Sequence, residues 1–255
     1  MARSAIMNII IQAATKAGRA LIRDFGEVQN LQVSLKGAHD YAKLASQNAG
    51  NLILKELHKA RPEYHFLLEN SKEITGKDSQ HCFTINPLDG ATNFLHGIPL
   101  FAISISLQRQ GKVVAGLIYN PALDELYTAE KGIGAFFNDR RLRIANRRKL
   151  QESVIGIGNP SFGEKGDSLY FLKLRQTIGE LAQIRIMGAS TLGMAYTAAG
   201  RFDGFWEENV SSCNLGSSLL IIRESGGFIS ESPIKSIIAG NNFIHSALLK
   251  KLQDI

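Results

Sequence analysis

The chain has 255 residues, of which 44% are hydrophobic, and a formal net charge of +6. This length and apolar content are sufficient to bury a large core as one compact unit or as two closely packed halves. No apolar run reaches the roughly 20 residues that a membrane-spanning helix needs, and two cysteines cannot build a disulfide framework. The apolar N-terminal segment continues as an amphipathic helix with charges at Lys16, Arg19 and Arg23, so we do not interpret it as a secretion signal. We therefore expect a protein of the bacterial cytoplasm that does not enter a membrane.

The first half of the chain shows two long helical patterns followed by strand patterns. Apolar residues at helical spacing predict helices at 5–25 and 41–60, the second ending before Pro62. Strands are predicted at 65–68, 82–85, 101–108, 113–119 and 125–129. The third and fourth of these strands form a hairpin around Gln110-Gly111.

The second half begins with a strand at 154–158, after a basic run at 140–149. Helices are then predicted at 167–182, 191–199, 215–224 and 243–252, and strands at 184–187, 202–207, 228–230 and 237–239. Helices and strands alternate with no internal repeat and no low-complexity linker. This order predicts an enzyme-like domain of the α/β or α+β class.

The segment with the most chemical information is Cys82-Phe-Thr-Ile-Asn-Pro-Leu-Asp-Gly-Ala-Thr-Asn-Phe94. A strand ends near Pro87, Asp89-Gly90 predicts a sharp turn, and the following residues predict the first turn of a helix. This order brings an acidic side chain next to free backbone N–H groups. Such an arrangement can hold a metal ion and a phosphate side by side.

This segment resembles the signature of the inositol monophosphatase family, Asp-Pro-Ile/Leu-Asp-Gly-Thr-x-Asn-Phe. The resemblance continues along nearly the whole chain, in the stretches 66–69, 132–138, 188–192, 199–207 and 223–227. It implies a layered α–β–α–β–α sandwich of the inositol monophosphatase and fructose-1,6-bisphosphatase (sugar phosphatase) type. It further implies an N-terminal half at 1–150 that carries the signature, a C-terminal half at 151–255, and a site between them.

Members of this family hydrolyse phosphomonoesters with Mg²⁺ ions, which bridge the phosphate, lower the pKa of a bound water and stabilise the leaving group. Mg²⁺ is a hard ion that prefers carboxylate and carbonyl oxygens. By the resemblance, the metal positions of this chain are Glu69, Asn86, Leu88 (through its backbone carbonyl), Asp89 and Asn214. Only Glu69 and Asp89 keep a carboxylate, since Asn86 and Asn214 stand where the family has aspartates.

The positions that orient the attacking water are altered as well. Ser46 stands where the family usually has an aspartate, and Ala91 replaces a threonine. Asn70 replaces a further acidic residue, and Lys43 lies one turn before Ser46, where a small polar residue is usual. Loss of general-base help alone costs a factor of ~10²–10⁴ in rate. The resemblance therefore implies weak binding of fewer Mg²⁺ ions, and a phosphatase whose activity is weak or lost.

The remaining site residues concern the substrate. By the resemblance, the backbone of Gly90, Ala91 and Thr92 binds phosphate, and the substrate positions in the second half are Gly188, Ser190 and Glu207. The ligand implied is a small phosphorylated polyol or sugar. Taken without the resemblance, Asp89 is a turn residue, and Glu69 and Glu207 are solvated charges.

The sequence is compatible with three functions. The first is a Mg²⁺-dependent phosphatase of inositol 1-phosphate or a related sugar or nucleotide phosphate. The second is a non-catalytic homodimeric scaffold or regulator that works with the transcription and ribosomal-RNA machinery, and the third is a sensor of a phosphorylated ligand. The basic run at 140–149 suits an RNA or acidic protein partner, although such a run is also typical of a solvated hairpin and linker.

Overall fold

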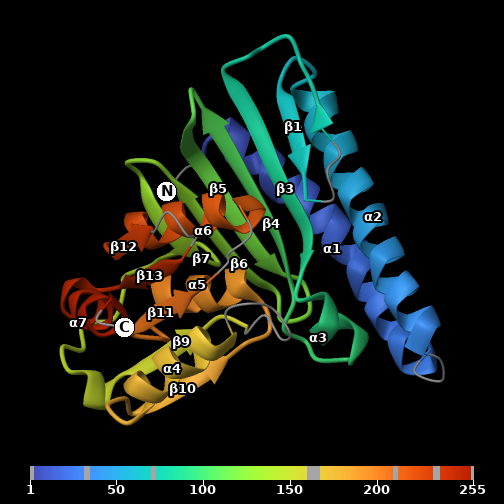
Figure 1. Cartoon of the computed structure of the whole chain (residues 1–255). Coiled ribbons are helices and arrows are strands. Elements are labelled where there is room, and N and C mark those ends of the chain that lie inside the picture. Colours follow the sequence, from blue (N-terminus) through green and yellow to red (C-terminus); the bar gives the residue numbers. More distant parts are fainter. Residues whose placement is uncertain are drawn as a thin grey trace.

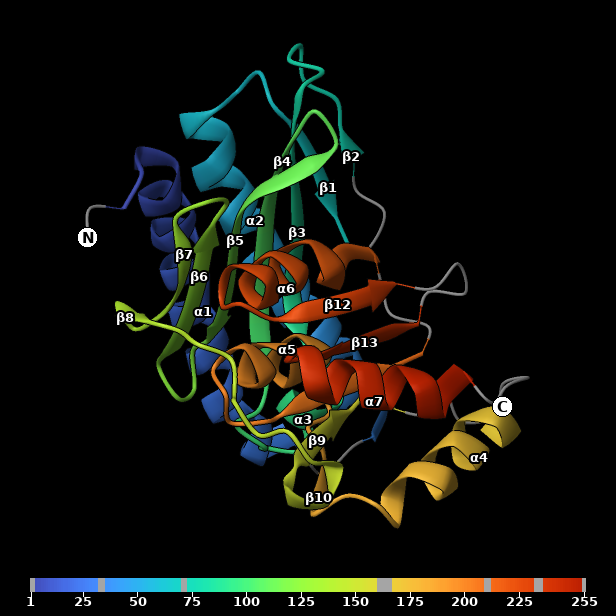
Figure 2. The same cartoon turned by 90° about the vertical axis from the view of Figure 1, so that its left-hand side faces the viewer.

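A computed structural model describes residues 3–31, 35–69, 73–159, 167–208, 212–231 and 236–253. In this part of the chain, two β-sheets alternate with three layers of helices (Figures 1 and 2). Helices α1 (Ala5–Leu31) and α2 (Leu35–Ala60) cover the first sheet, and α5 (Ser190–Ala198) and α6 (Ser212–Glu224) lie between the sheets. Helices α4 (Asp167–Ile178) and α7 (Asn242–Gln253) cover the second sheet. The predicted five-layer sandwich is therefore confirmed.

The first sheet has eight strands in the order β2-β1-β3-β4-β5-β6-β7-β8. Their bounds are β1 His65–Leu68, β2 Glu73–Ile74, β3 His81–Asp89, β4 Ala102–Arg109, β5 Lys112–Asn120, β6 Glu125–Glu130, β7 Gly134–Phe137 and β8 Arg140–Arg141. Strands β1 and β3 are parallel, and the other neighbours pair antiparallel. The short helix α3 (Ala91–Leu95) follows β3 directly.

The second sheet has five strands in the order β10-β9-β11-β13-β12. Their bounds are β9 Val154–Ile157, β10 Gln183–Ile186, β11 Gly204–Glu207, β12 Phe228–Glu231 and β13 Ile237–Gly240, and a 3-10 helix η1 (Leu150–Glu152) precedes them. Strands β9, β10 and β11 are parallel, so their carboxyl ends meet at one edge of the sheet. The chain turns into α5 soon after β10, so the first turn of α5 starts near this edge.

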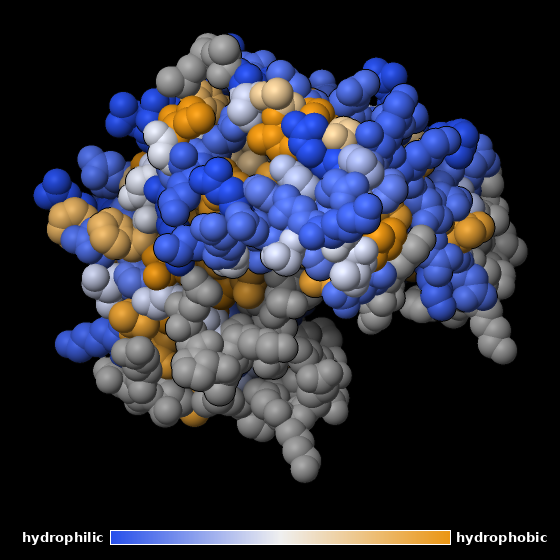
Figure 3. All heavy atoms as spheres, turned by 90° about the horizontal axis from the view of Figure 1, so that it is seen from above, coloured by the Kyte–Doolittle hydropathy of each residue, from blue (hydrophilic) through white to orange (hydrophobic). Residues whose placement is uncertain are grey.

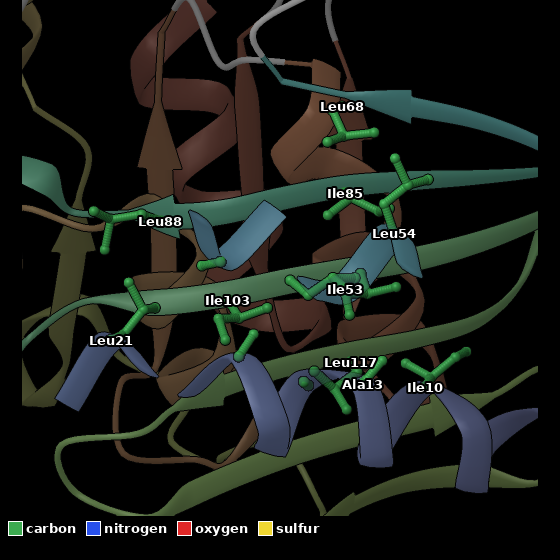
Figure 4. Close-up of a cluster of buried hydrophobic side chains, with 14 of the residues drawn as sticks. Ile10, Ala13, Leu21, Ile53, Leu54, Leu68, Ile85, Leu88, Ile103 and Leu117 are labelled. Atoms are coloured by element: carbon green, nitrogen blue, oxygen red, sulfur yellow. The ribbon is translucent and has the colours of Figure 1, made fainter. Parts of the chain in front are cut away.

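The hydrophobic core follows the layers. One buried cluster joins α1 and α2 to the first sheet, and Figure 4 shows Ile10, Ala13 and Leu21 of α1 and Ile53 of α2 directed at the strands. A second cluster fills the middle of the molecule around α5 and α6, and a third lies between the second sheet and α4 and α7. Burial of these apolar side chains is the main favourable term that holds the five layers together.

Several predicted boundaries are wrong for local reasons. We predicted that β3 would end at Ile85, before Pro87, but it continues to Asp89 through a register shift, which is where a strand tolerates a proline. Strands β2 and β8 were not predicted, because two residues do not establish an alternating pattern. Strand β7 was not predicted, because Gly134-Ala-Phe-Phe137 does not alternate between apolar and polar residues. The hairpin turn predicted at Gln110-Gly111 is confirmed, with φ values of 51° and 72° at these residues.

Within the described residues, no helix combines the length and the apolar character that crossing a bilayer requires. Figure 3 shows one face of the molecule, on which hydrophilic side chains predominate and apolar ones form separate small patches.

Candidate functional site

The family signature lies at the end of β3, where the strand contains a β-bulge. Asn86 pairs with Ser104 of β4, whereas Asp89 pairs with Ala102, so β3 advances by three residues while β4 advances by two. Since side chains alternate between the two faces of a sheet, this extra residue places Asn86 and Asp89 on the same face. Asn86 is only 1% exposed, and its Oδ1 atom accepts a hydrogen bond of 3.0 Å from the backbone N–H of Leu88.

The turn after Asp89 depends on glycine. Gly90 has φ +85°, and a Cβ atom there would lie 2.8 Å from the carbonyl oxygen of Leu100. Asn93, in α3, fixes the turn against the second half of the chain, because its Nδ2 donates to the carbonyl oxygens of Leu100 (2.7 Å) and Met187 (2.8 Å). Gly188, the next residue after Met187, has φ +72° and lies against the Asn93 side chain. The signature and the segment before α5 are thereby held in contact.

The carboxylate of Asp89 is hydrogen bonded to the first turn of α5. Its Oδ2 atom accepts from the backbone N–H of Thr191 (2.8 Å) and from the Thr191 hydroxyl (2.6 Å). The Gly90 N–H also hydrogen bonds to this carboxylate. Burial raises the pKa of Asp89, and the hydrogen bonds from Thr191 and Gly90 oppose that shift because they stabilise the charged form.

Glu207, at the carboxyl end of β11, meets the same helical turn. Its Oε1 atom accepts a 2.6 Å hydrogen bond from the Ser190 hydroxyl. Its Oε2 atom is buried and has no hydrogen-bond partner among the described residues. Burial raises the pKa of Glu207 to about 7, and the nearby Asp89 contributes in the same direction. Gly158 leaves the space for this side chain, because a Cβ atom there would lie 2.0 Å from the Glu207 Cγ.

Glu69, which follows β1, lines a cavity of about 250 Å³ together with Ser46 and Asn51 of α2 and Pro87 of the bulge. Burial raises the pKa of Glu69 to about 7, and the Asp89 charge adds to the shift. Ser46 is 9% exposed, whereas Lys43, one turn earlier on α2, is exposed. The cavity therefore joins a predicted metal position to a predicted water-orienting position.

The structure brings most of the predicted positions into one region. Ser46, Glu69, Asn86, Asp89, Gly188, Ser190 and Glu207 are buried or half-buried around the bulge and the first turn of α5. Ala91 and Thr92 are exposed on α3, and the Leu88 side chain packs into the core beside α1 and α2. Asn70 and the side chain of Asn214 lie outside the described part of the chain.

Three residues that shape this region were not predicted: Asn93, Gly158 and Thr191. Asn93 belongs to the signature, and Thr191 to the stretch at 188–192, so both were part of the resemblance without a role. Their partners are distant in the sequence, at Met187 and Asp89 respectively. Only the tertiary fold reveals these contacts.

The described side chains do not fit a pair of Mg²⁺ ions. No group of three or more Asp, Glu, His or Cys side chains in the described residues could hold a metal ion. Mg²⁺ requires near-octahedral coordination by oxygen atoms, with carboxylates to balance its charge. Here Asn86 supplies a neutral amide, and Oδ2 of Asp89 already accepts two hydrogen bonds. This arrangement therefore supports no chemical step through a metal ion.

The five layers and the acids from both sheets that meet at α5 define a protein of the two-sheet layered α+β class. The chain belongs to the inositol monophosphatase family, whose family model matches residues 2–253. It is 54% identical over 260 residues to the inositol-1-monophosphatase of Mesorhizobium japonicum, an alignment that covers 99% of this chain and 98% of that protein.

Two further similarities extend this result. A solved structure of the extragenic suppressor protein suhB from Bartonella henselae superposes with a TM-score of 0.90 at 50% identity, covering 98% of this chain and 99% of that one. The Nus factor SuhB of Pasteurella multocida is 36% identical over 224 residues, covering 88% of this chain and 84% of that protein. The relatives of this chain thus include proteins named inositol-1-monophosphatase and proteins named Nus factor SuhB.

Proposed function

We propose that this chain keeps the inositol monophosphatase fold while its Mg²⁺-dependent phosphatase activity is weak or lost. The observation that carries the proposal is Asn86, a buried amide at the end of the signature strand, where the family pattern has a metal-binding aspartate. An amide oxygen carries no net charge, so it binds a divalent cation less strongly than a carboxylate does. Ser46 and Ala91 also offer no carboxylate or threonine hydroxyl to orient a water molecule.

The ligand that this site suits best is a small phosphorylated polyol or sugar. The Oε2 atom of Glu207 supports this choice, because it is buried without a partner in the described part of the chain, which is costly, and a ligand hydroxyl could satisfy it. Binding of such a ligand without turnover would make the protein a sensor. Phosphate binding by the backbone of residues 90–92 stays a prediction.

The test is phosphate release from inositol 1-phosphate and a panel of sugar and nucleotide phosphates, with Mg²⁺ titrated. The wild type is compared with a restored variant that carries Ser46→Asp, Asn86→Asp, Ala91→Thr and Asn214→Asp. We expect a silent or very slow wild type and a gain of activity in the restored variant. The matched control adds Asp89→Asn to the restored variant and should abolish the gain. Wild-type turnover at ordinary rates of ~1 s⁻¹ or more would overturn the proposal.

A metal titration gives an independent measurement. We expect low-millimolar Mg²⁺ to raise the melting temperature of the wild type only slightly, because a ligand stabilises the folded state appreciably only when its concentration exceeds its dissociation constant. A large increase at these concentrations would contradict weak metal binding.

A second candidate function is a cytoplasmic, homodimeric partner of the transcription and ribosomal-RNA machinery. The basic segment 140–149 supports it, because all its Arg and Lys side chains are exposed while its backbone is held in place. Asn241 donates to the carbonyl oxygens of Ala145 (2.9 Å) and Arg147 (2.7 Å), and Arg148 lies over the Phe243 ring at 4.7 Å. The relatives named Nus factor SuhB support the same proposal.

This candidate is tested by mobility shift with single-stranded RNA at increasing salt. Reversal of charge at Arg140 and Arg143, both exposed, should weaken binding and reduce its salt dependence. The control reverses the charge of Lys55 and Lys59, which are exposed on α2, so that both double variants have the same net charge. Equal binding by both double variants would contradict an RNA surface at 140–149.

A further inference from the structure

We infer that Phe228 and Phe243, two exposed rings beside the basic segment 140–149, form a platform on which the bases of a single-stranded nucleic acid stack. This inference rests on the second candidate function, RNA binding at this segment, and deepens it. The cations of the segment contact phosphates, whereas the rings add a contact that only the bases can make.

The exposure of these two rings carries the inference. Phe228 is 51% exposed and Phe243 is 46% exposed, although phenylalanine is among the residues most often buried. Phe228 begins β12 and pairs with Gly240 at the end of β13, and Phe243 follows three residues later, in the first turn of α7. The start of β12 and the start of α7 both lie near the chain that leads from β8 to β9 (Figure 2). Single apolar side chains on a surface are common, but neighbouring ones mark an interaction site.

One buried side chain fixes the first turn of α7 to the basic segment. Asn241 is 7% exposed, and its Oδ1 atom accepts hydrogen bonds of 3.0 Å from the backbone N–H groups of Phe243 and Ile244. Its Nδ2 atom donates to the carbonyl oxygens of Ala145 and Arg147. The backbone that carries Phe243 and the backbone of the segment therefore keep a fixed relation, which reduces the ordering cost of binding.

Arg148 connects the two kinds of contact. Its guanidinium carbon lies 4.7 Å from the centroid of the Phe243 ring, and both side chains are exposed. This cation–π contact holds the planar guanidinium over the ring. Nucleic-acid bases stack on guanidinium planes as well as on aromatic rings, so the outer face of Arg148 extends the platform.

The charges around the rings favour a polyanion. Residues 140–149 contain six basic residues and no acidic one. Within the described residues, Arg143 and Arg148 form no ion pair, and the partner of Lys149 is the exposed Glu152 at 3.5 Å. An exposed pair of this kind is worth little, so Lys149 can exchange it for a phosphate.

The combination of rings and cations selects the class of polyanion. Acidic side chains of a protein partner would satisfy the charges but offer no planar face to Phe228 and Phe243. A duplex keeps its bases stacked on one another. A single strand supplies phosphates for the cations and unstacked bases for the rings at the same time.

The test measures fluorescence anisotropy of a labelled oligouridine of about 12 nucleotides, a length within the range that such surfaces occupy. An abasic strand of the same length carries the same phosphates and no bases, so the difference between the two strands reports stacking. Phe228→Leu with Phe243→Leu removes both rings and keeps apolar side chains. We expect this double variant to bind oligouridine about tenfold or more weakly, and to bind the abasic strand as the wild type does.

Two controls separate stacking from general effects of substitution. Phe228→Trp with Phe243→Trp keeps aromatic rings and should bind oligouridine at least as tightly as the wild type. Phe171→Leu removes a ring from α4 that is 47% exposed and does not belong to the platform, so it should change nothing. The dependence of binding on salt should be the same in the leucine variant and the wild type, because the phosphate contacts remain.

Equal binding of oligouridine and the abasic strand by the wild type overturns the inference, and so does a double leucine variant that binds oligouridine like the wild type. Either result leaves the second candidate function to its own test, charge reversal at Arg140 and Arg143. If the wild type does not bind oligouridine at all, both proposals are wrong. A polyglutamate peptide that binds as tightly as oligouridine also overturns the inference, since the surface then recognises charge alone. If the double leucine variant loses its cooperative thermal transition, the two single variants decide by the same criterion.

Discussion

Strand β11 has a buried carboxylate at each end, and the two have opposite environments. Asp203, just before the strand, is 0% exposed, and both its oxygens are used: Arg147 donates to Oδ1 at 3.1 Å and the Val154 N–H to Oδ2 at 2.9 Å. Glu207, the last residue of the strand, is 6% exposed, and the described residues give a partner to one of its two oxygens.

This difference distinguishes a carboxylate whose hydrogen bonds link parts of the fold from a carboxylate with an oxygen left for a ligand. Asp203 ties the basic segment and β9 to β11, and its bonds are complete without any other molecule. Glu207 keeps a buried, unpaired oxygen at the carboxyl end of the parallel strands, which is where α/β proteins commonly bind ligands. Burial alone therefore does not distinguish the two acids. What distinguishes them is whether each carboxylate oxygen has a hydrogen-bond partner.

The largest expected effect is at Asp203. Replacement by alanine leaves the Val154 N–H without its partner and removes a bond to Arg147, so we expect a loss of about 3 kcal/mol in the free energy of unfolding. Urea denaturation at pH 7 measures this loss. Asp203→Asn keeps the shape and one oxygen, so it should cost clearly less. An Asp203→Ala variant as stable as the wild type would show that these bonds are not structural.

A smaller effect is expected at Gly158. Alanine there would place a Cβ atom 2.0 Å from Glu207 Cγ and push the glutamate out of its position, so we expect a loss of about 2 kcal/mol from overpacking. The control is Gly179→Ala, since a Cβ atom at Gly179 would meet nothing within 4 Å. If the two variants melt at the same temperature, Glu207 is not held as tightly as its contacts indicate.

The third effect is gradual, a dependence of stability on pH that extends over several pH units. Glu69 and Glu207 both have a pKa of about 7 in the folded protein, raised from 4.5 by burial. A raised carboxyl pKa means that the folded state binds protons more tightly than the unfolded state, so the stabilisation is complete below pH 4.5 and is lost as the pH rises to 7 and beyond. For the buried Glu207, a rise in pKa from 4.5 to about 7 corresponds to a loss of about 3 kcal/mol, and the half-buried Glu69 contributes less because solvent screens its charge.

The measurement is the melting temperature between pH 5 and pH 8 in metal-free buffer. Glu207→Gln should reduce the fall in melting temperature, and the same change at the exposed Glu152 should not. A melting temperature that rises over this interval in the wild type, or a slope that Glu207→Gln leaves unchanged, would contradict the raised pKa of Glu207.

The resemblance of the signature around Asp89 to the inositol monophosphatase family predicted the layered fold, whereas the consecutive residues themselves predicted only a strand, a glycine turn and a helix start. The same local logic predicted the hairpin at Gln110-Gly111. It could not predict that Thr191 would meet Asp89, since 102 residues separate them and no periodicity relates a helix start to a distant strand end. The hydrogen-bond environment of Glu207 could not be predicted either, because the sequence shows that a carboxyl group is present but not which residues pack around it.

The bulge in β3 has a consequence for how this family can change. The single extra residue between Asn86 and Asp89 sets which side of the sheet receives the carboxylate. Substitutions at Pro87 or Leu88 preserve that count, whereas deletion of either residue would remove the bulge and leave a regular ladder, with the aspartate still opposite Ala102. A bulge bends its strand and strengthens the local twist, so the deletion would change the direction in which the end of β3 leads into Gly90 and α3. The exchange of aspartate for asparagine at position 86 leaves this bend in place.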